Sequence, residues 1–165
     1  MIQLASLDAL KAAFPTVSIS EFRNQMRAVV PPAEIYDSLE FLRDDREFEL
    51  LVDITCVDYL TFRDAEHRFG LVYLLAGIET NERLTVRCFL DEPKLTVPSV
   101  VPLWEGANWM EREVYDMFGI EFEGHPDLRR ILLPDEFTAF PLRKDYPMQG
   151  RGERHNFPVL RRNMA

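Results

Sequence analysis

Three apolar segments that follow one another closely constrain the fold of this chain more than any other feature. They span residues 49–59, 68–78 and 82–90, and each has the length and composition of a β-strand. The connection at 79–81, "ETN", is as short as a hairpin turn, which favours antiparallel pairing of the strands beside it. No strand–helix–strand alternation appears here, which disfavours a doubly wound parallel sheet. The sequence therefore predicts an α+β fold: a mixed, mainly antiparallel sheet with helices packed over one face.

Shorter elements precede these strands. Ser6 is expected to cap a first helix that ends before Pro15. Two short strands, "VSIS" and "MRAVV", are predicted on either side of the polar turn "RNQ". The segment "PPAEIYDSLEFLRDD" predicts a second helix, because its prolines suit a first turn and its apolar residues repeat at helical spacing. The apolar side of the first helix is formed by Leu7, Leu10 and Phe14.

A last helix is predicted after a proline-rich segment. Asn108 is expected at its N-cap, with Glu111 three residues further on and Gly119 at its left-handed C-terminal position. Arg112 and Asp116 lie one turn apart, and we expect Arg112 to pair with carboxylates around this helix. The apolar stripe of the helix is formed by Met110, Val114, Met117 and Phe118.

The pattern changes after residue 120. Five of the 11 prolines lie in residues 120–165, and apolar residues there come in short clusters without helical or strand spacing. A disordered tail would carry few such clusters. We therefore divide the chain into an α+β domain at 1–120 and an extended segment at 121–165, which becomes ordered along its own domain or, as we prefer, along a partner. Within that segment, regular structure is not expected, and residues 135–165 are interpreted as a docking strap.

Ionisable side chains are concentrated in "EREVYDMFGIEFEGHPDLRRILLP", residues 111–134. A metal site would need His125 and Asp127 to join the helix carboxylates, but their spacing matches no compact metal-binding motif. Glu111 and Glu113 are turned about 200° from each other around a helix, which makes them a poor acid–base pair. Arginines directly beside apolar residues, as in "LRRILLP" and "PLRKDYP", are typical of an interface instead.

Other chemistries leave no clear pattern. Cys56 and Cys88 lie far apart in alternating apolar segments, which predicts buried thiols rather than ligands of an iron–sulfur cluster or a zinc ion. Neither a phosphate-binding glycine loop nor a nucleophile elbow is found. The longest apolar run, "LVYLLAGI", is far shorter than the roughly 20 residues of a membrane-spanning helix. The N-terminus lacks the basic opening of a secretory signal, so a location on the cytosolic side is expected.

Charge is distributed unevenly along the chain. The formal net charge is −9, yet residues 126–165 carry eight basic and five acidic residues. The body before them is therefore strongly acidic, which argues against a broad nucleic-acid surface. The basic tail is suited to an acidic partner. Because "RGERH" has no interleaved aromatic residues, RNA binding by the tail is disfavoured.

The ionisable stretch resembles the signature of the 30 kDa subunit family of respiratory complex I, the NADH:quinone oxidoreductase. The signature residues are Glu111, Arg112, Glu113, Asp116, Met117, Phe118, His125, Arg129, Ile131 and Leu132. "PLRKDYP" at 141–147 is similar to a second hallmark of that family, and "DITCVDY" at 53–59 resembles a family strand with two flanking aspartates. Phe137 and Ala139 stand where that family commonly has Trp and Gly.

This resemblance implies a cofactor-free subunit of the peripheral arm, whose C-terminal segment wraps the large quinone-site subunit. Iron–sulfur clusters and FMN would belong to partner subunits, among them a cluster-binding subunit, and electrons would pass from NADH to quinone in those neighbours. No nucleic-acid partner is implied, and the chain would meet the cytoplasmic side of the inner membrane only through the complex. No catalytic residue is expected in this chain. The residues implied in docking or its support are Glu111, Arg112, Glu113, Asp116, His125, Arg129, Arg130, Arg143, Lys144, Asp145 and Tyr146.

Two alternatives stay open. Related subunits serve membrane-bound hydrogenases and ferredoxin- or coenzyme F420-linked dehydrogenases, so this chain does not determine the electron donor of its complex. A stand-alone acid–base or metal hydrolase is the alternative from a different class, and it requires activity in the isolated protein.

Overall fold

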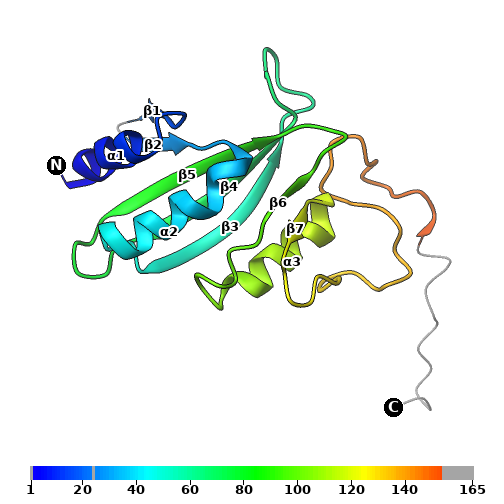
Figure 1. Ribbon diagram of the computed structural model, residues 1–165. Coiled ribbons are helices and arrows are strands. Elements are labelled where there is room, and N and C mark those ends of the chain that lie inside the picture. Colours follow the sequence, from blue (N-terminus) through cyan, green and yellow to red (C-terminus); the bar gives the residue numbers. More distant parts are fainter. Residues whose placement is uncertain (1, 24, 154–165) are drawn as a thin grey trace.

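The computed structural model describes residues 2–23 and 25–153 of the chain. Within that part, five strands form one sheet in the order β1-β2-β5-β4-β3, and two short strands form a second sheet. Figure 1 shows the long strands β3, β4 and β5 running side by side, with β6 and β7 beside them. The strands are β1 (Ser18–Phe22), β2 (Gln25–Val29), β3 (Leu50–Asp58), β4 (Phe69–Ala76), β5 (Arg83–Leu90), β6 (Thr96–Pro98) and β7 (Glu121–Glu123).

The predicted fold class is confirmed, and so is the direction of pairing. β3 pairs with β4, β4 with β5 and β1 with β2 in antiparallel registers, while β2 joins β5 in parallel. A bulge between Leu51 and Asp53 in β3 shifts the register at that point, which turns one extra residue, Val52, out of the ladder. The sheet is therefore mixed but mainly antiparallel.

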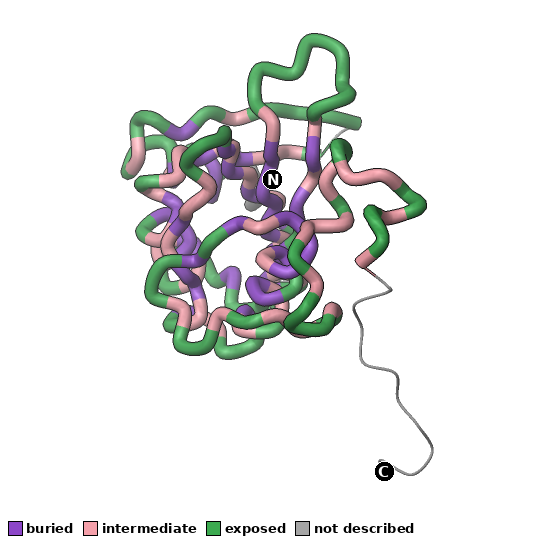
Figure 2. The backbone as a smooth tube through the Cα atoms, turned by 90° about the vertical axis from the view of Figure 1, so that its right-hand side faces the viewer, coloured by how far each residue is buried: buried purple, intermediate pink, exposed green. Residues whose placement is uncertain are grey.

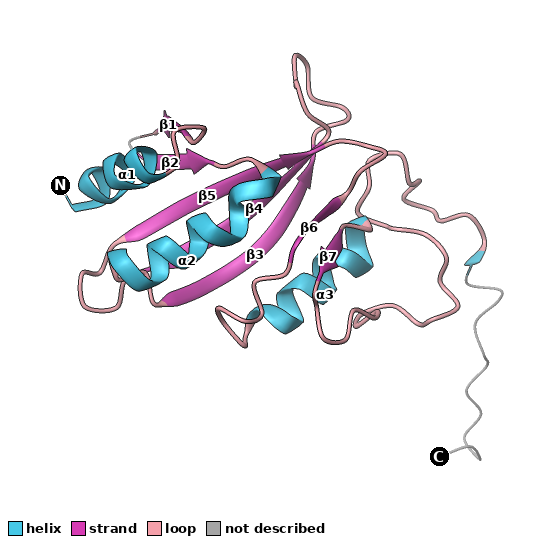
Figure 3. Cartoon of the chain, viewed as in Figure 1, coloured by secondary structure: helices cyan, strands magenta, loops and turns pink. Residues whose placement is uncertain are grey.

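The helices cover one face of the five-stranded sheet. They are α1 (Ile2–Ala13), the 3-10 turn η1 (Pro32–Glu34), α2 (Ile35–Arg46) and α3 (Ala107–Phe118). In Figure 3, α2 lies across the front of the long strands and α3 lies beside β3. Alternate residues of the strands point to these helices and are fully or nearly buried, as Leu71, Tyr73 and Leu75 of β4 illustrate. Each such side chain stabilises the fold by about 1.5–3 kcal/mol, so the helix layer is fixed by this shared core.

Two predicted helix starts are wrong. α1 begins at Ile2, so Ser6 lies inside the helix and is buried rather than serving as its N-cap. α3 begins at Ala107 after Gly106, and its N-cap makes no side-chain hydrogen bond. The backbone N–H groups of Leu103 and Trp104 donate to the carbonyl of Val100, and that of Ala107 donates to the carbonyl of Trp104. These turns lead directly into the helix, so no cap by Asn108 is needed. Gly119 is confirmed as the left-handed end of α3, with φ 75°.

Regular structure does not end at Gly119, contrary to the prediction. β7 follows at once and pairs in parallel with β6, and Ser99 N–H donates to the carbonyl of Glu123. The three residues of β7 were too few to show a periodic pattern in the sequence. Residues 120 and 122 are buried whereas 121 and 123 are exposed, as in a strand packed on its own domain. Figure 2 shows that the chain leading to the grey C-terminal trace is intermediate or exposed.

Candidate functional site

Asp116 is the centre of the contacts that hold the segment after β7. Its side chain is fully buried, and Oδ2 accepts three consecutive backbone N–H groups, from Ile131, Leu132 and Leu133, at 3.0, 2.7 and 2.9 Å. Oδ1 accepts from Arg130 Nη1 at 2.6 Å. Burial alone would raise the pKa of Asp116, but these hydrogen bonds outweigh it and hold the pKa below its usual range. The carboxylate therefore anchors the segment as an anion.

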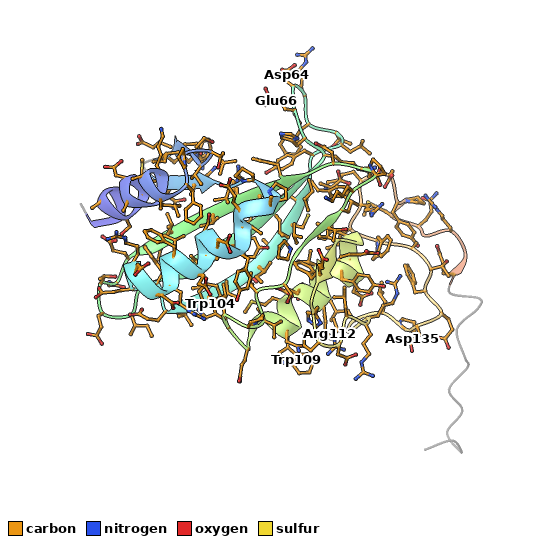
Figure 4. All side chains as sticks on the ribbon, in the orientation of Figure 1. Asp64, Glu66, Trp104, Trp109, Arg112 and Asp135 are labelled. Carbon is orange, nitrogen blue, oxygen red and sulfur yellow. The ribbon has the colours of Figure 1, made fainter. Side chains whose placement is uncertain are left out.

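Arg112 also holds this segment, but through the backbone. Its Nε donates to the carbonyl of Arg129 at 3.1 Å and its Nη2 to that of Arg130 at 3.3 Å. The guanidinium stacks over the exposed ring of Trp109, 5.1 Å from the centroid. Figure 4 labels both residues on the same edge of the molecule. The expected pairing of Arg112 with carboxylates is wrong, because Asp116 is taken by Arg130 and the neighbouring N–H groups.

Glu111 points into the core from the same helix. Its two oxygens accept from Ser99 Oγ and the Val100 N–H, each at 2.7 Å, and its side chain is fully buried. Burial raises the pKa of Glu111 to about 7, although the hydrogen bonds from Val100 and Ser99 partly oppose it. The acid thus ties the loop before α3 to the helix instead of facing a ligand.

His125 is buried against α3, with Nε2 4.0 Å from Glu111 Oε2. Its Nε2 faces the carbonyl of Asn108 at 3.2 Å and must donate there, while its Nδ1 accepts the N–H of Asp127 at 3.0 Å. These partners assign the neutral tautomer with the proton on Nε2. Both ring nitrogens are engaged, which leaves neither directed at a metal ion.

A second group of contacts fastens residues 142–145 to the sheet. The buried Asp58, at the end of β3, accepts the Lys144 N–H through Oδ2 at 2.8 Å and the Leu60 N–H through Oδ1 at 2.9 Å. Arg68 bridges Glu92 and Asp145, at 2.7 and 2.8 Å. Residues 86 positions apart in sequence are thus joined by a buried carboxylate.

Arg143 completes this group. Its Nε donates to the carbonyl of Phe118 at 2.6 Å, its Nη1 to Glu92 at 3.0 Å, and its guanidinium lies between the rings of Phe69 and Phe140. A Cβ at Gly119 would come within 2.6 Å of Phe140 and 2.9 Å of Arg143. Gly119 is therefore required by the close approach of this segment as well as by its backbone angle.

The remaining predicted residues are exposed or half-buried. Glu113 is exposed, the Arg129 side chain is 70% exposed and pairs with Asp127, and Tyr146 packs against Phe137 near Arg151. Sequence reasoning missed Arg68, Glu92 and Ser99, for which no local motif gave a signal. Asp58 had one: it is the second aspartate of "DITCVDY".

The outer side of α3 and the segment that follows it carries exposed apolar residues. Trp109 is 61% exposed, Leu132 62%, Leu142 51% and Met148 fully exposed. The same backbone that Asp116 and Asp58 hold in place thus presents apolar side chains outward. Anchored backbone with outward apolar side chains is an arrangement suited to binding another protein.

Comparison with known proteins gives consistent matches. The sequence model of the family described as respiratory-chain NADH dehydrogenase, 30 Kd subunit, matches residues 28–152. An NADH-quinone oxidoreductase subunit of Geobacter sulfurreducens is 40% identical over 140 residues, which cover 85% of this chain and 85% of that protein. The subunit of the same name in Laribacter hongkongensis is 41% identical over 165 residues and covers 94% and 85%.

Two solved structures are similar as well. The trypsin-resistant fragment of Nqo5 superposes with a TM-score of 0.71 at 34% identity, covering 78% of this chain and 100% of that one. A chain of the membrane-bound sulfane sulfur reductase, an archaeal respiratory membrane complex, superposes with a TM-score of 0.75 at 27% identity, covering 96% and 93%.

The fold, the anchored segment and these similarities define a subunit of a respiratory oxidoreductase complex. More narrowly, the chain belongs to the family of the 30 kDa subunit of respiratory-chain NADH dehydrogenase, the enzyme that is also called NADH-quinone oxidoreductase or complex I. The resemblance drawn from the signature is confirmed, and the partners of the chain are other complex I subunits. None of the helices in residues 2–23 and 25–153 has the length and apolarity needed to span a bilayer.

Proposed function

We propose that this chain is a cofactor-free peripheral subunit that docks on the quinone-site subunit and supports it while electrons pass from NADH to quinone in neighbouring subunits. The docking surface is the outer side of α3 with the segment 129–148. The cluster-binding subunit is the second expected neighbour, and the chain meets the cytoplasmic side of the membrane only through the complex.

The observation that carries this proposal is the contrast between buried charges and exposed apolar side chains. Asp116 and Arg112 fix the backbone of the segment from inside, whereas Trp109, Leu132 and Leu142 are more than half exposed. Large apolar side chains on a rigid backbone bind a protein partner at low entropic cost. The supporting acids have their oxygens engaged by their own chain, which disfavours the alternative of a stand-alone acid–base or metal hydrolase.

A second assembly is favoured by one observation. The similarity to a chain of the membrane-bound sulfane sulfur reductase covers 96% of this chain. The same scaffold is therefore suited to complexes with other electron donors or acceptors, including the hydrogenases and the ferredoxin- or coenzyme F420-linked dehydrogenases. NADH-dependent quinone reduction by the purified parent complex distinguishes these assignments.

Co-purification of the full chain with the tagged quinone-site subunit tests the docking surface. Leu132→Asp and Trp109→Ala should reduce the recovery of that subunit at least about tenfold, because both anchors lie at the proposed interface. Ile78→Asp is the matched control, since Ile78 is 66% exposed but lies in the turn between β4 and β5. Undiminished recovery with both variants would refute docking through this surface.

A further inference from the structure

The five-stranded sheet has a second face, opposite the helices, which we call the open face. Its outward residues form three rows across the strands. The rows are Val57–Gly70–Phe89, Thr55–Val72–Arg87–Val29 and Asp53–Leu74–Thr85–Arg27. Thr55 and the bulged Val52 are exposed, Val57, Leu74 and Phe89 are half-buried, and Val72 is buried between its neighbours on the sheet.

The composition of the open face is unlike that of a solvated sheet. A sheet with one wet face alternates apolar residues inside with polar residues outside. Here Val52, Val57, Val72, Leu74 and Phe89 point away from the core. Four strands spaced about 4.8 Å apart and of about eight residues each give roughly 500 Å² of flat area. A standard protein interface buries about 800 Å² on each partner, so this face with the adjoining loop is of the right size.

The net charge of the outward strand residues on the open face is opposite in sign to that of the chain. Strands β2 and β5 present Arg27, Arg83 and Arg87 outward, whereas Asp53 lies on the edge strand β3 and is separated from them by β4. The acidic residues Asp64 and Glu66 are confined to the loop at one end of the face. The chain as a whole has a net charge of −9. An apolar surface bordered by arginines attracts a partner that carries carboxylates beside apolar side chains.

One end of the open face is hollowed. A cavity of about 330 Å³ is lined by Tyr59, His67, Arg87 and Phe89 on one side and by Asp64, Ala65 and Glu66 of the loop between β3 and β4 on the other. This loop projects from the sheet at the top of Figure 4, where Asp64 and Glu66 are labelled. The ring of His67 stacks on Phe89 at 5.4 Å, and Tyr59 packs near both Phe89 and Phe62. Aromatic residues and arginine are the types that most often anchor protein interfaces.

Two details indicate that the hollow is built. A Cβ at position 70 would lie 2.7 Å from the Tyr59 ring, so Gly70 is what allows that ring to cross the strand. Arg87 Nη2 donates to the Tyr59 hydroxyl at 3.2 Å, but Arg87 Nε is buried and has no acceptor within the described residues. Burying an N–H without an acceptor is unfavourable, so the guanidinium of Arg87 keeps unused donor capacity beside the hollow.

We propose that the open face is a second docking surface, and that its occupant is an acidic, apolar-faced segment of another subunit that seats a carboxylate on Arg87 between Tyr59, His67 and Phe89. This surface lies opposite the helix layer and is independent of docking on the quinone-site subunit. It therefore gives the chain two binding sides and makes it a connector between neighbours.

Charge argues against the nearest alternative occupant. That occupant would be the C-terminal sequence of this chain, residues 154–165, which contains three arginines and no aspartate or glutamate. Its positive charge would be repelled by Arg27 and Arg87. A second copy of this chain and an anionic membrane remain as outcomes that the experiment separates.

Thiol labelling of the full chain, alone and in the purified parent complex, tests the proposal. Thr55→Cys places a thiol in the middle row of the open face, and the native Cys56 and Cys88 are buried, which makes the label specific. Maleimide should modify Thr55→Cys readily in the isolated monomer and at least about tenfold more slowly in the complex, because the centre of an interface excludes solvent. Lys11→Cys, at an exposed position of α1, is the control for general access. Equal Thr55→Cys rates in the two states would overturn the proposal.

Charge reversal identifies the chemistry of the occupant. Arg27→Glu with Arg87→Glu should restore labelling of Thr55→Cys in the complex or lower the yield of the complex, whereas Arg46→Glu, the same charge change at the end of α2, should do neither. Circular dichroism of each isolated variant checks that it is folded. An unchanged complex in the double variant would overturn the acidic occupant. A dimer of the isolated chain by light scattering, or protection of Thr55→Cys by phosphatidylglycerol vesicles, would overturn it in favour of a second copy or a lipid surface. Co-purification with the quinone-site subunit is a separate readout, so failure of either proposal is recognised independently.

Discussion

Replacing Asp116 by alanine should destabilise the protein more than any other single substitution among the contacts that hold the segment after β7. The substitution removes the acceptor of three backbone N–H groups and the partner of Arg130, whose side chain is only 12% exposed. Hydrogen bonds to a charged group are worth about 1.5–3 kcal/mol each, but water and relaxation recover part of the loss. Breaking one side of a buried ion pair costs about 3–5 kcal/mol, and the better helix propensity of alanine returns about 0.5 kcal/mol. We therefore expect a loss of about 3–4 kcal/mol.

Urea unfolding of the full chain, followed by far-ultraviolet circular dichroism, measures this loss. Glu113→Ala on the same helix is the matched control, because Glu113 is exposed and such changes usually stay within about 0.5 kcal/mol. Asp116→Asn should fall between the two, since one amide oxygen can still accept from the segment while the amide NH₂ faces Arg130. Limited proteolysis should cut Asp116→Ala first after residue 124. A loss below about 1 kcal/mol would show that the segment is not held by this carboxylate.

Four further outcomes are expected. The pKa of Glu111 is raised from 4.5 to about 7, so the folded state holds the proton of this carboxyl more tightly than the unfolded state does. The free energy of unfolding should therefore fall by about 3 kcal/mol as the pH rises from about 4.5 to about 7. Urea titrations at several pH values measure this slope, which Glu111→Gln should flatten. Burial raises the pKa of the Cys56 and Cys88 thiols to about 12, so maleimide should modify neither in the native protein and both in urea; rapid native labelling would contradict their burial. Arg112→Ala should cost about 1–3 kcal/mol by thermal or urea unfolding, because two backbone carbonyls lose their donor; an unchanged midpoint would argue that water replaces the guanidinium. A chain ending at Pro134 should lose on the order of 3 kcal/mol in the same measurement, because the buried Asp58 loses the Lys144 N–H and Arg68 loses Asp145; full stability would show that the contacts of residues 142–145 contribute little.

The sheet and its helices were predictable because each long strand repeats apolar residues at intervals of two over eight or more positions. The start of α3 was not, since the turns from Val100 onward feed the helix through backbone hydrogen bonds that have no side-chain pattern. The burial of Glu111 and Asp116 was also missed: a carboxylate in a helix is expected to be solvent-exposed unless donors for its oxygens can be identified. In both residues the donors come from distant parts of the chain: Ser99 for Glu111, and the backbone at 131–133 for Asp116.

The interpretation of the C-terminal segment changes for a similar reason. Irregular apolar clusters indicate that a segment lies on a surface, but not on which one. The described part, to residue 153, lies on its own domain through Asp58, Asp116 and Arg68, so the partner preferred from the sequence is not needed to order it. The rest of the predicted strap, residues 154–165, lies outside the described residues. The boundary placed at 120 and the docking role of the signature residues stay predictions.

The anchor at Asp116 has a consequence for how this surface can evolve. Its carboxylate binds the main chain at 131–133, and every amino acid except proline supplies the required N–H. Side chains at these positions, such as the exposed Leu132, are therefore free to change without releasing the segment. When the surface of the partner changes during evolution, a substitution at Leu132 can restore the fit without loss of the anchor. Leu132→Pro is the exception, because proline has no N–H to donate to Asp116. The backbone N–H groups of these residues thus hold the segment on its domain, while their side chains are available to bind the partner, and selection can act on the two separately.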